Sequence, residues 1–255
     1  MHSLAQPFNA VVNGASRGIG LAFVRALLAV SSVERLFATS RHAASDEKLA
    51  DFASGGDHRL RALDMDVTSE ASVAAAAAAV RAEAARVDLF VNCAGLLHDG
   101  TSVQPEKRLA DVAPASLERS FAVNAIGPLL IAKHFQGLLP RQDRAVFASL
   151  SARVGSIGDN RLGGWYAYRA SKAAQNMITR NLSIELRRRA RGIICVALHP
   201  GTVDTELSRP FQGNVPEERL FSAERAARQL LHVIDGLQPE DNGGFFAWDA
   251  QPIPW

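Results

Sequence analysis

The chain alternates short runs of β-branched and apolar residues with longer segments of helical periodicity. Seven runs are typical of strands: Phe8–Val12, Arg35–Thr39, Leu60–Asp64, Asp88–Val91, Ala145–Leu150, Ile193–Leu198 and Phe245–Trp248. The segments expected to be helical are Ile19–Val30, Ser69–Arg86, Ser116–Leu139, Tyr166–Arg189 and Ala223–Ile234. Because strand–helix–strand crossovers are right-handed, this order predicts an α/β fold, a doubly wound seven-stranded parallel sheet with helices on both faces.

The composition fits one soluble domain that spans residues 1–255. Of the 255 residues, 47% are hydrophobic and 21% are charged, and the formal net charge is only +2, so we expect no nucleic-acid partner. No apolar stretch is long enough to span a bilayer, so we expect no membrane partner. The two cysteines, Cys93 and Cys195, match no metal or redox spacing, which predicts a cytoplasmic protein without a metal.

A glycine-rich turn joins the first predicted strand to the first predicted helix. Glycines at this place allow a tight turn and let a pyrophosphate approach backbone N–H groups at the start of the helix. The spacing G-x-x-x-G-x-G differs from the commoner G-x-G-x-x-G fingerprint, but its position after a strand favours a Rossmann-type dinucleotide site. The residues expected to contact the dinucleotide are Gly14, Ser16, Arg17, Gly18, Ile19 and Gly20.

A cation follows the second predicted strand, where sites for NAD usually carry an acidic residue that binds the adenosine ribose. Arg41, together with Arg17, could form charge-assisted hydrogen bonds to a 2′-phosphate. We therefore expect NADP(H) to be preferred over NAD(H). The alternative is that Arg41 is a solvated loop residue.

Tyr168 and Lys172 are four residues apart in a predicted helix, so their side chains face the same direction. A neighbouring ammonium group favours phenolate and is expected to lower the pKa of the tyrosine, which would make Tyr168 a usable general acid. Such a pair is common on helix surfaces, but the glycine turn in the same chain favours hydride chemistry at a carbonyl group.

Six motifs occur in the order found in the short-chain dehydrogenase/reductase family, which the chain resembles over nearly its whole length. They are Gly14-x-x-x-Gly18-x-Gly20, Asp66-Val67-Thr68, Asn92-Cys93-Ala94-Gly95, Asn124-Ala125-Ile126-Gly127, Tyr168-x-x-x-Lys172 and Pro200-Gly201-Thr202-Val203-Asp204-Thr205. Within the family, the runs 163–169 and 242–255 are most similar to C-factor and Sniffer-type carbonyl reductases. The resemblance implies a small carbonyl or alcohol substrate, and a homodimer or homotetramer that packs through 116–139 and 166–189.

The resemblance also implies roles for single residues. Asp66 and Val67 would contact adenine, although an aspartate there could equally cap a turn between strand and helix. Lys172 would also hold the nicotinamide ribose, and Asn124 would support a proton-relay water. The remaining cofactor contacts would be Asn92, Ala94 and Gly95 near the adenosine ribose, and Pro200, Gly201, Val203 and Thr205 near the nicotinamide.

One position departs from the family pattern in a way that affects the chemistry. The carbonyl-binding serine of the family usually lies three residues before a glycine, and relative to Gly155 that position holds Ala152. A shift of one residue turns a strand side chain to the other face, so Ser151 could serve only where the strand has ended or bulged. Ser151 is the first candidate and Ser156 the second, and the third possibility is that no serine is catalytic.

Two functions from different classes fit these residues. The first is an NADPH-dependent carbonyl reductase or alcohol dehydrogenase, which the Tyr168/Lys172 pair favours. The second is a non-catalytic Rossmann protein that binds NAD(P) as a sensor or signalling protein, which Ala152 favours. The segment Thr205–Pro216 could close over a substrate, and its Phe211 could form an apolar pocket or a core contact.

Overall fold

A computed structural model describes residues 1–54, 57–213 and 215–255 and contains the predicted seven-stranded parallel sheet. Its strand order is β3-β2-β1-β4-β5-β6-β9, and every pairing is parallel. The strands are β1 Phe8–Asn13, β2 Val33–Ser40, β3 Leu60–Asp64, β4 Leu89–Asn92, β5 Ala145–Leu150, β6 Ile193–His199 and β9 Phe245–Ala247. The order reverses direction beside β1, which is where open α/β sheets bind ligands.

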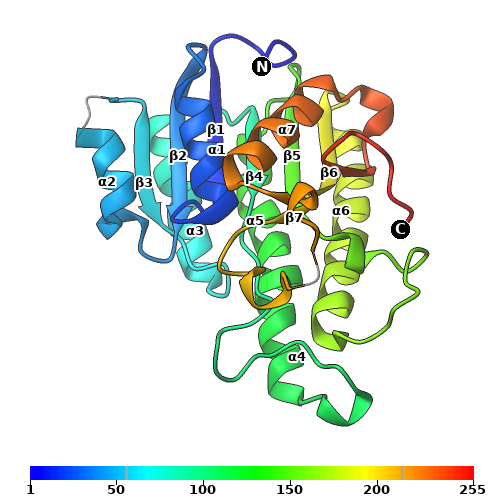
Figure 1. The fold of residues 1–255 in the computed structure, drawn as a ribbon. Helices are drawn as coiled ribbons and strands as arrows, with labels where there is room; N and C mark the ends of the chain where they lie inside the picture. Colours follow the sequence, from blue (N-terminus) through cyan, green and yellow to red (C-terminus); the bar gives the residue numbers. More distant parts are fainter. Residues whose placement is uncertain (55–56, 214) are drawn as a thin grey trace.

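Helices cover both faces of this sheet (Figure 1). They are α1 Gly18–Leu28, α2 Glu47–Ser54, α3 Glu70–Glu83, α4 Pro114–Phe121, α5 Gly127–Phe135, α6 Tyr166–Arg189 and α7 Ala223–Gly236. Alternate side chains of β1 show the two layers, because Ala10 and Val12 pack in the core of α1 and α7, whereas Val11 packs in the core of α3 and α5. The doubly wound Rossmann-type architecture is therefore confirmed.

The predicted helix Ser116–Leu139 is not α-helical throughout. A π-helical turn, Ala122–Ile126, separates α4 from α5, and a short 3-10 turn follows α5. Pro128 at the start of α5 has no N–H to continue an α-helical ladder, and the wider turn carries Asn124. The short helix α2 was not predicted.

A two-stranded parallel sheet holds the connection that follows β6. Its strands are β7 Thr202–Val203 and β8 Leu220–Phe221. This connection lies at the same end of the main sheet as α4 and the first turn of α6 (Figure 1). The carboxyl ends of the central strands and the loops expected to bind ligand thus meet at one edge.

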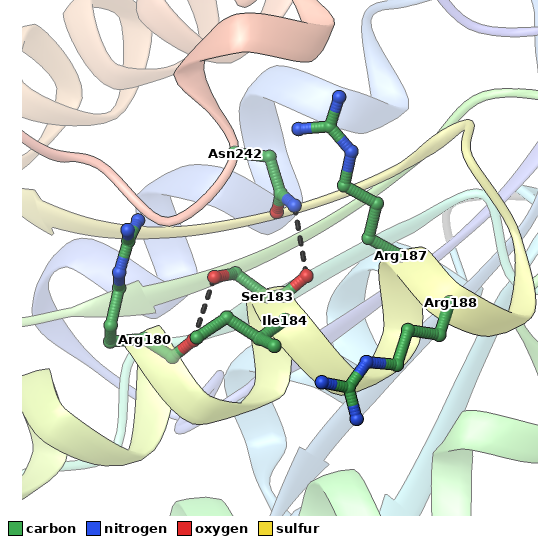
Figure 2. A pocket seen from close by; sticks show the side chains of 6 residues that line it. All are labelled: Arg180, Ser183, Ile184, Arg187, Arg188 and Asn242. Carbon is green, nitrogen blue, oxygen red and sulfur yellow. Dashed lines mark hydrogen bonds between the residues drawn. The ribbon is translucent and has the colours of Figure 1, made fainter.

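The far end of α6 carries several arginines. Asn242 donates its Nδ2–H to the carbonyl oxygen of Ser183 at 2.9 Å, and a hollow of about 250 Å³ lies beside this contact. Figure 2 shows that the guanidinium groups of Arg180, Arg187 and Arg188 point in different directions around it. They do not converge on one ligand. Among the described helices, none is long and apolar enough to cross a membrane.

Candidate active site

The glycine turn has the geometry of an anion site. Gly14 and Gly18 have φ of +77° and +53°, and a Cβ on Gly20 would lie only 2.0 Å from the Gly14 oxygen. Helix α1 begins at Gly18 with no side-chain cap and no acidic residue in its first turn. Its first N–H groups can therefore donate to a bound anion. These features fit the pyrophosphate of a dinucleotide.

Hydrogen bonds of Asn13 and Asn92 connect the ends of β1, β2 and β4 next to this turn. Asn13 donates from Nδ2 to Asn92 Oδ1 at 2.7 Å and accepts from the Thr39 hydroxyl at 3.1 Å. Asn92 Nδ2 is buried and has no partner among the described residues. Because a buried donor without a partner is costly, the position of Asn92 Nδ2 beside the turn fits a group that donates to a ligand.

Arg41 and Asp66 follow the ends of β2 and β3. Arg41 is exposed just after β2. Burial raises the pKa of Asp66, but hydrogen bonds from Thr68 and the charges of Arg119 and Arg41 outweigh it, so this pKa lies below its usual range. Asp66 Oδ1 accepts from the Thr68 amide at 2.9 Å, which makes Asp66 a turn cap. Arg41 is thus near enough to Asp66 to influence its charge.

The structure buries Tyr168 and Lys172 together on the first turns of α6. Lys172 Nζ lies 5.9 Å from the centre of the Tyr168 ring and donates to the Leu150 oxygen at 2.9 Å. Burial raises the pKa of Tyr168 and lowers the pKa of Lys172 to about 7. The net shift of the Tyr168 pKa is therefore upward and not downward as expected, because desolvation dominates. Tyr168 therefore stays protonated at neutral pH.

Asn124 completes this cluster from the π-helical turn. Its Oδ1 accepts from the Leu96 amide at 2.7 Å, and its Nδ2 donates to the Leu96 oxygen at 2.8 Å and to the Ser171 hydroxyl at 3.0 Å. A Cβ on Gly95 would lie 3.6 Å from Lys172 Nζ and 3.7 Å from Asn124 Oδ1. The structure therefore brings Asn124, Tyr168 and Lys172 together and places Gly95, which was expected near the adenosine ribose, beside Lys172 and Asn124.

The hydroxyl groups of both candidate serines have hydrogen-bond partners within the protein. Strand β5 ends at Leu150, so Ser151 lies beyond the strand, but its hydroxyl donates to Asn176 Oδ1 at 2.7 Å. Ser156 donates its hydroxyl to the Pro254 oxygen. A hydroxyl has one O–H to donate, so neither serine has a donor left for a substrate carbonyl. Ser151 therefore has a partner within the protein, and its role in carbonyl binding stays a prediction.

The segment after β6 crosses from the sheet to the glycine turn. A Cβ on Gly18 would lie 3.2 Å from the Thr205 methyl group, and Arg17 pairs with Glu206 at 2.5 Å. Pro200 and Gly201 begin this segment, and the φ of Gly201 is +80°. Val203 is buried in β7. The predicted nicotinamide residues thus lie opposite the predicted pyrophosphate turn.

An aromatic row covers Tyr168. The Phe211 ring lies 5.0 Å from the Trp165 ring and 5.7 Å from the His98 ring, and Trp165 lies 6.3 Å from Tyr168. Phe211, which the sequence suggested for a pocket or a core contact, thus packs against Trp165, and His98 is an unpredicted partner. Residue 214, within the suggested closing segment, lies outside the described residues.

A carboxylate that is distant in the sequence caps the N-terminus of helix α6. Trp165 precedes the helix with φ +52°, and its amide donates to the Glu106 backbone oxygen at 2.6 Å. The Glu106 side chain accepts from the Ala167 amide at 3.2 Å and is buried. Glu106 thus caps the helix one residue before Tyr168. No local pattern could reveal this contact, because it links residues 61 positions apart.

The parallel sheet, the glycine turn and the buried Tyr168/Lys172 pair together define a class of protein, the dinucleotide-dependent oxidoreductases. The sequence model of the short chain dehydrogenase family matches residues 9–215, and the chain belongs to this family. It is an oxidoreductase of that family.

Individual relatives agree with the predicted subgroup. The NADPH-bound carbonyl reductase from chicken fatty liver has a TM-score of 0.86 and 31% identity, covering 100% of this chain and 97% of its own. Carbonyl reductase Sniffer of D. melanogaster has a TM-score of 0.85 and 27% identity, covering 98% and 100%. C-signal of Myxococcus xanthus is 37% identical over 174 residues, which are 66% of this chain and 93% of that protein.

Proposed function

We propose that the protein is an NADPH-dependent oxidoreductase that transfers hydride between nicotinamide and a small carbonyl or alcohol substrate. The observation that supports this most is the buried Tyr168, which stays protonated beside Lys172 at the carboxyl ends of the strands. The chicken relative is an NADPH-bound carbonyl reductase.

Side chains of the protein would take separate roles in the proposed transfer of hydride and proton. The bound dinucleotide supplies the hydride. Tyr168 donates its phenolic proton to the substrate oxygen, and Lys172, when charged, stabilises the phenolate left behind. The buried, aromatic-covered position of Tyr168 excludes water from this transfer. Asn124 fixes the loop at Leu96 beside Lys172 and would support the water that returns the proton.

The cofactor would lie along the edge where β1, β2, β3, β4 and β6 end. The α1 N–H groups of the glycine turn would hold its pyrophosphate, and Arg41 with Arg17 would hold its 2′-phosphate. The other proposed contacts are Asp66, Val67, Asn92, Ala94, Gly95, Tyr168, Lys172, Pro200, Gly201, Val203 and Thr205.

Cofactor choice is tested at Arg41. We expect Arg41→Asp to weaken NADPH binding by about 10- to 100-fold and to leave NADH binding unchanged or tighter, because a carboxylate repels the 2′-phosphate. Fluorescence titration with both cofactors measures this. Arg35→Asp, near the other end of β2, is the matched control. Equal loss for NADPH and NADH, or no loss, would contradict the preference.

Carbonyl binding without a serine is tested at Ser151. Because its only O–H donates to Asn176, we expect Ser151→Ala to keep kcat/KM within about threefold. The same change should lower the free energy of unfolding by about 1–3 kcal/mol, since Asn176 Oδ1 loses its partner. Steady-state kinetics and urea unfolding measure the two effects. A loss of turnover without a loss of stability would restore Ser151 as a catalytic residue.

The competing function is a non-catalytic sensor that only binds NAD(P). A panel of aldehydes, ketones and quinones incubated with NADPH separates the two. The reductase predicts oxidation of NADPH that depends on Tyr168, and the sensor predicts binding without oxidation.

We also propose a cytoplasmic homodimer or homotetramer. Leu129 on α5 and Met177 and Ile184 on α6 are 46%, 62% and 45% exposed, which supports burial of these helices against a second copy. Both cysteines, Cys93 and Cys195, are free thiols, which supports a reducing compartment.

A further inference from the structure

Gln175 is a fully buried amide in contact with the amine of Lys172. It lies on α6 three residues after the lysine and has 0% exposure. Its Oε1 accepts from Lys172 Nζ at 2.8 Å, and its Nε2 donates to the Leu150 oxygen at 3.1 Å. Leu150 also accepts from Lys172 Nζ, so the three groups form a closed triangle.

The direction of this amide is fixed by its neighbours. A backbone carbonyl can only accept, so the Nε2 of Gln175 must face Leu150. Its Oε1 is then the atom left to face Lys172, and an ammonium group can only donate. The negative end of a side-chain dipole therefore points at the lysine amine at all times.

The other groups around Lys172 offer little to hold a charge. Cys93 at the end of β4 and Tyr168 on the preceding turn are the titratable groups that face it. Gly155 packs against Lys172 from the turn after β5, where Arg153 is paired with Asp159 at 3.0 Å. Among the described residues no carboxylate forms an ion pair with Lys172. Within the described part of the chain, two carbonyl oxygens accept from this amine, and burial lowers its pKa to about 7.

We propose that Gln175 is a positioning residue for the proposed reaction, which holds the Lys172 amine through its side-chain oxygen and favours the charged form of that amine. Lys172 then stabilises the phenolate of Tyr168, and Gln175 holds the Lys172 amine in place for that role. The inference rests on the proposed function for its chemistry, but the contact itself can be tested without turnover.

The test compares Gln175→Met with Gln175→Glu in the full chain. Methionine has a similar length and helix preference but lacks the acceptor, whereas glutamate adds a negative charge in the same shape. The chain has only four lysines, Lys48, Lys107, Lys133 and Lys172, so carbon-13 labelling of lysine side chains gives few NMR signals. Lys172→Met assigns the signal of Lys172.

We expect Gln175→Met to move the titration of Lys172 about one pH unit down and Gln175→Glu to move it about one unit up. The alkaline limb of kcat/KM against pH should move in the same two directions. Ser183→Ala removes another buried α6 side chain, which donates to Arg180, and should move neither.

Shifts of the same sign in both variants, or shifts within about 0.3 pH units of the wild type, would overturn the role of Gln175. If Gln175→Met does not unfold cooperatively, the Lys172 titration in Gln175→Glu tests the role of Gln175 by itself, and an upward shift is the expected result. Absence of NADPH oxidation in the wild-type protein contradicts the proposed function instead, because the NMR titration does not depend on activity.

Discussion

Replacing Tyr168 by phenylalanine is expected to lower kcat/KM for carbonyl reduction by about a thousandfold, the size typical of a lost general acid. The phenylalanine ring keeps the edge contact with Trp165 and removes only the phenolic proton. NADPH binding should change by less than about threefold, since the loss falls on the transition state. Steady-state kinetics and fluorescence titration of NADPH measure the two quantities.

The chain provides its own control for this change. Tyr166, the only other tyrosine, lies two residues earlier on α6 and is 39% exposed. Tyr166→Phe removes the same atom and should leave kcat/KM within about twofold. Equal losses in the two variants would show that the effect comes from the helix and not from a proton at Tyr168.

Replacing Lys172 by methionine is expected to lower kcat by about a hundredfold or more, because the phenolate of Tyr168 loses its nearby cation. The same change should alter how stability depends on pH. Burial lowers the pKa of Lys172 from 10.5 to about 7, so the unfolded chain binds its proton more tightly than the folded one. Charged Lys172 therefore opposes folding in full below about pH 7, and this cost fades as pH rises toward 10.5.

Urea unfolding of both proteins at several pH values tests the second effect. The free energy of unfolding of Lys172→Met, relative to the wild type, should increase as pH falls from about 10 to about 7. Lys133→Met is the control, because Lys133 is exposed and pairs with Glu70. A difference that stays constant over this range would show that Lys172 is not desolvated.

The strands and most helices were predictable because the local periodicity of apolar residues indicates them. β3, β5 and α6 have the predicted bounds, since each is a continuous run of one periodicity between clear turn residues. The break between α4 and α5 was not predicted. The π-helical turn there carries Asn124, whose side chain contacts Leu96 28 residues away, and helical periodicity contains no information about such a contact.

In the candidate site too, features set by local sequence were predictable and features set by distant contacts were not. The glycine turn and the i, i+4 pair of Tyr168 and Lys172 are local, so the sequence identified them. The pKa of Tyr168 was predicted in the wrong direction because a sequence shows which charges are near but not how much water burial removes. Gln175 follows Lys172 by one helical turn, so its contact with the lysine could have been predicted. The contacts of Glu106 with Ala167 and of Asn176 with Ser151 join residues that are distant in the sequence, so no local pattern indicates them.

The central claim is that hydride passes from nicotinamide to a carbonyl carbon while Tyr168 protonates the oxygen. The most direct measurement uses NADPH carrying deuterium at the transferable position, with the panel of aldehydes, ketones and quinones, and mass analysis of the products. We predict that the wild-type protein places deuterium on the carbinol carbon of at least one product and that Tyr168→Phe does so about a thousandfold more slowly. Tight NADPH binding with no deuterium transferred to any substrate would contradict the account and leave a protein that only binds the dinucleotide.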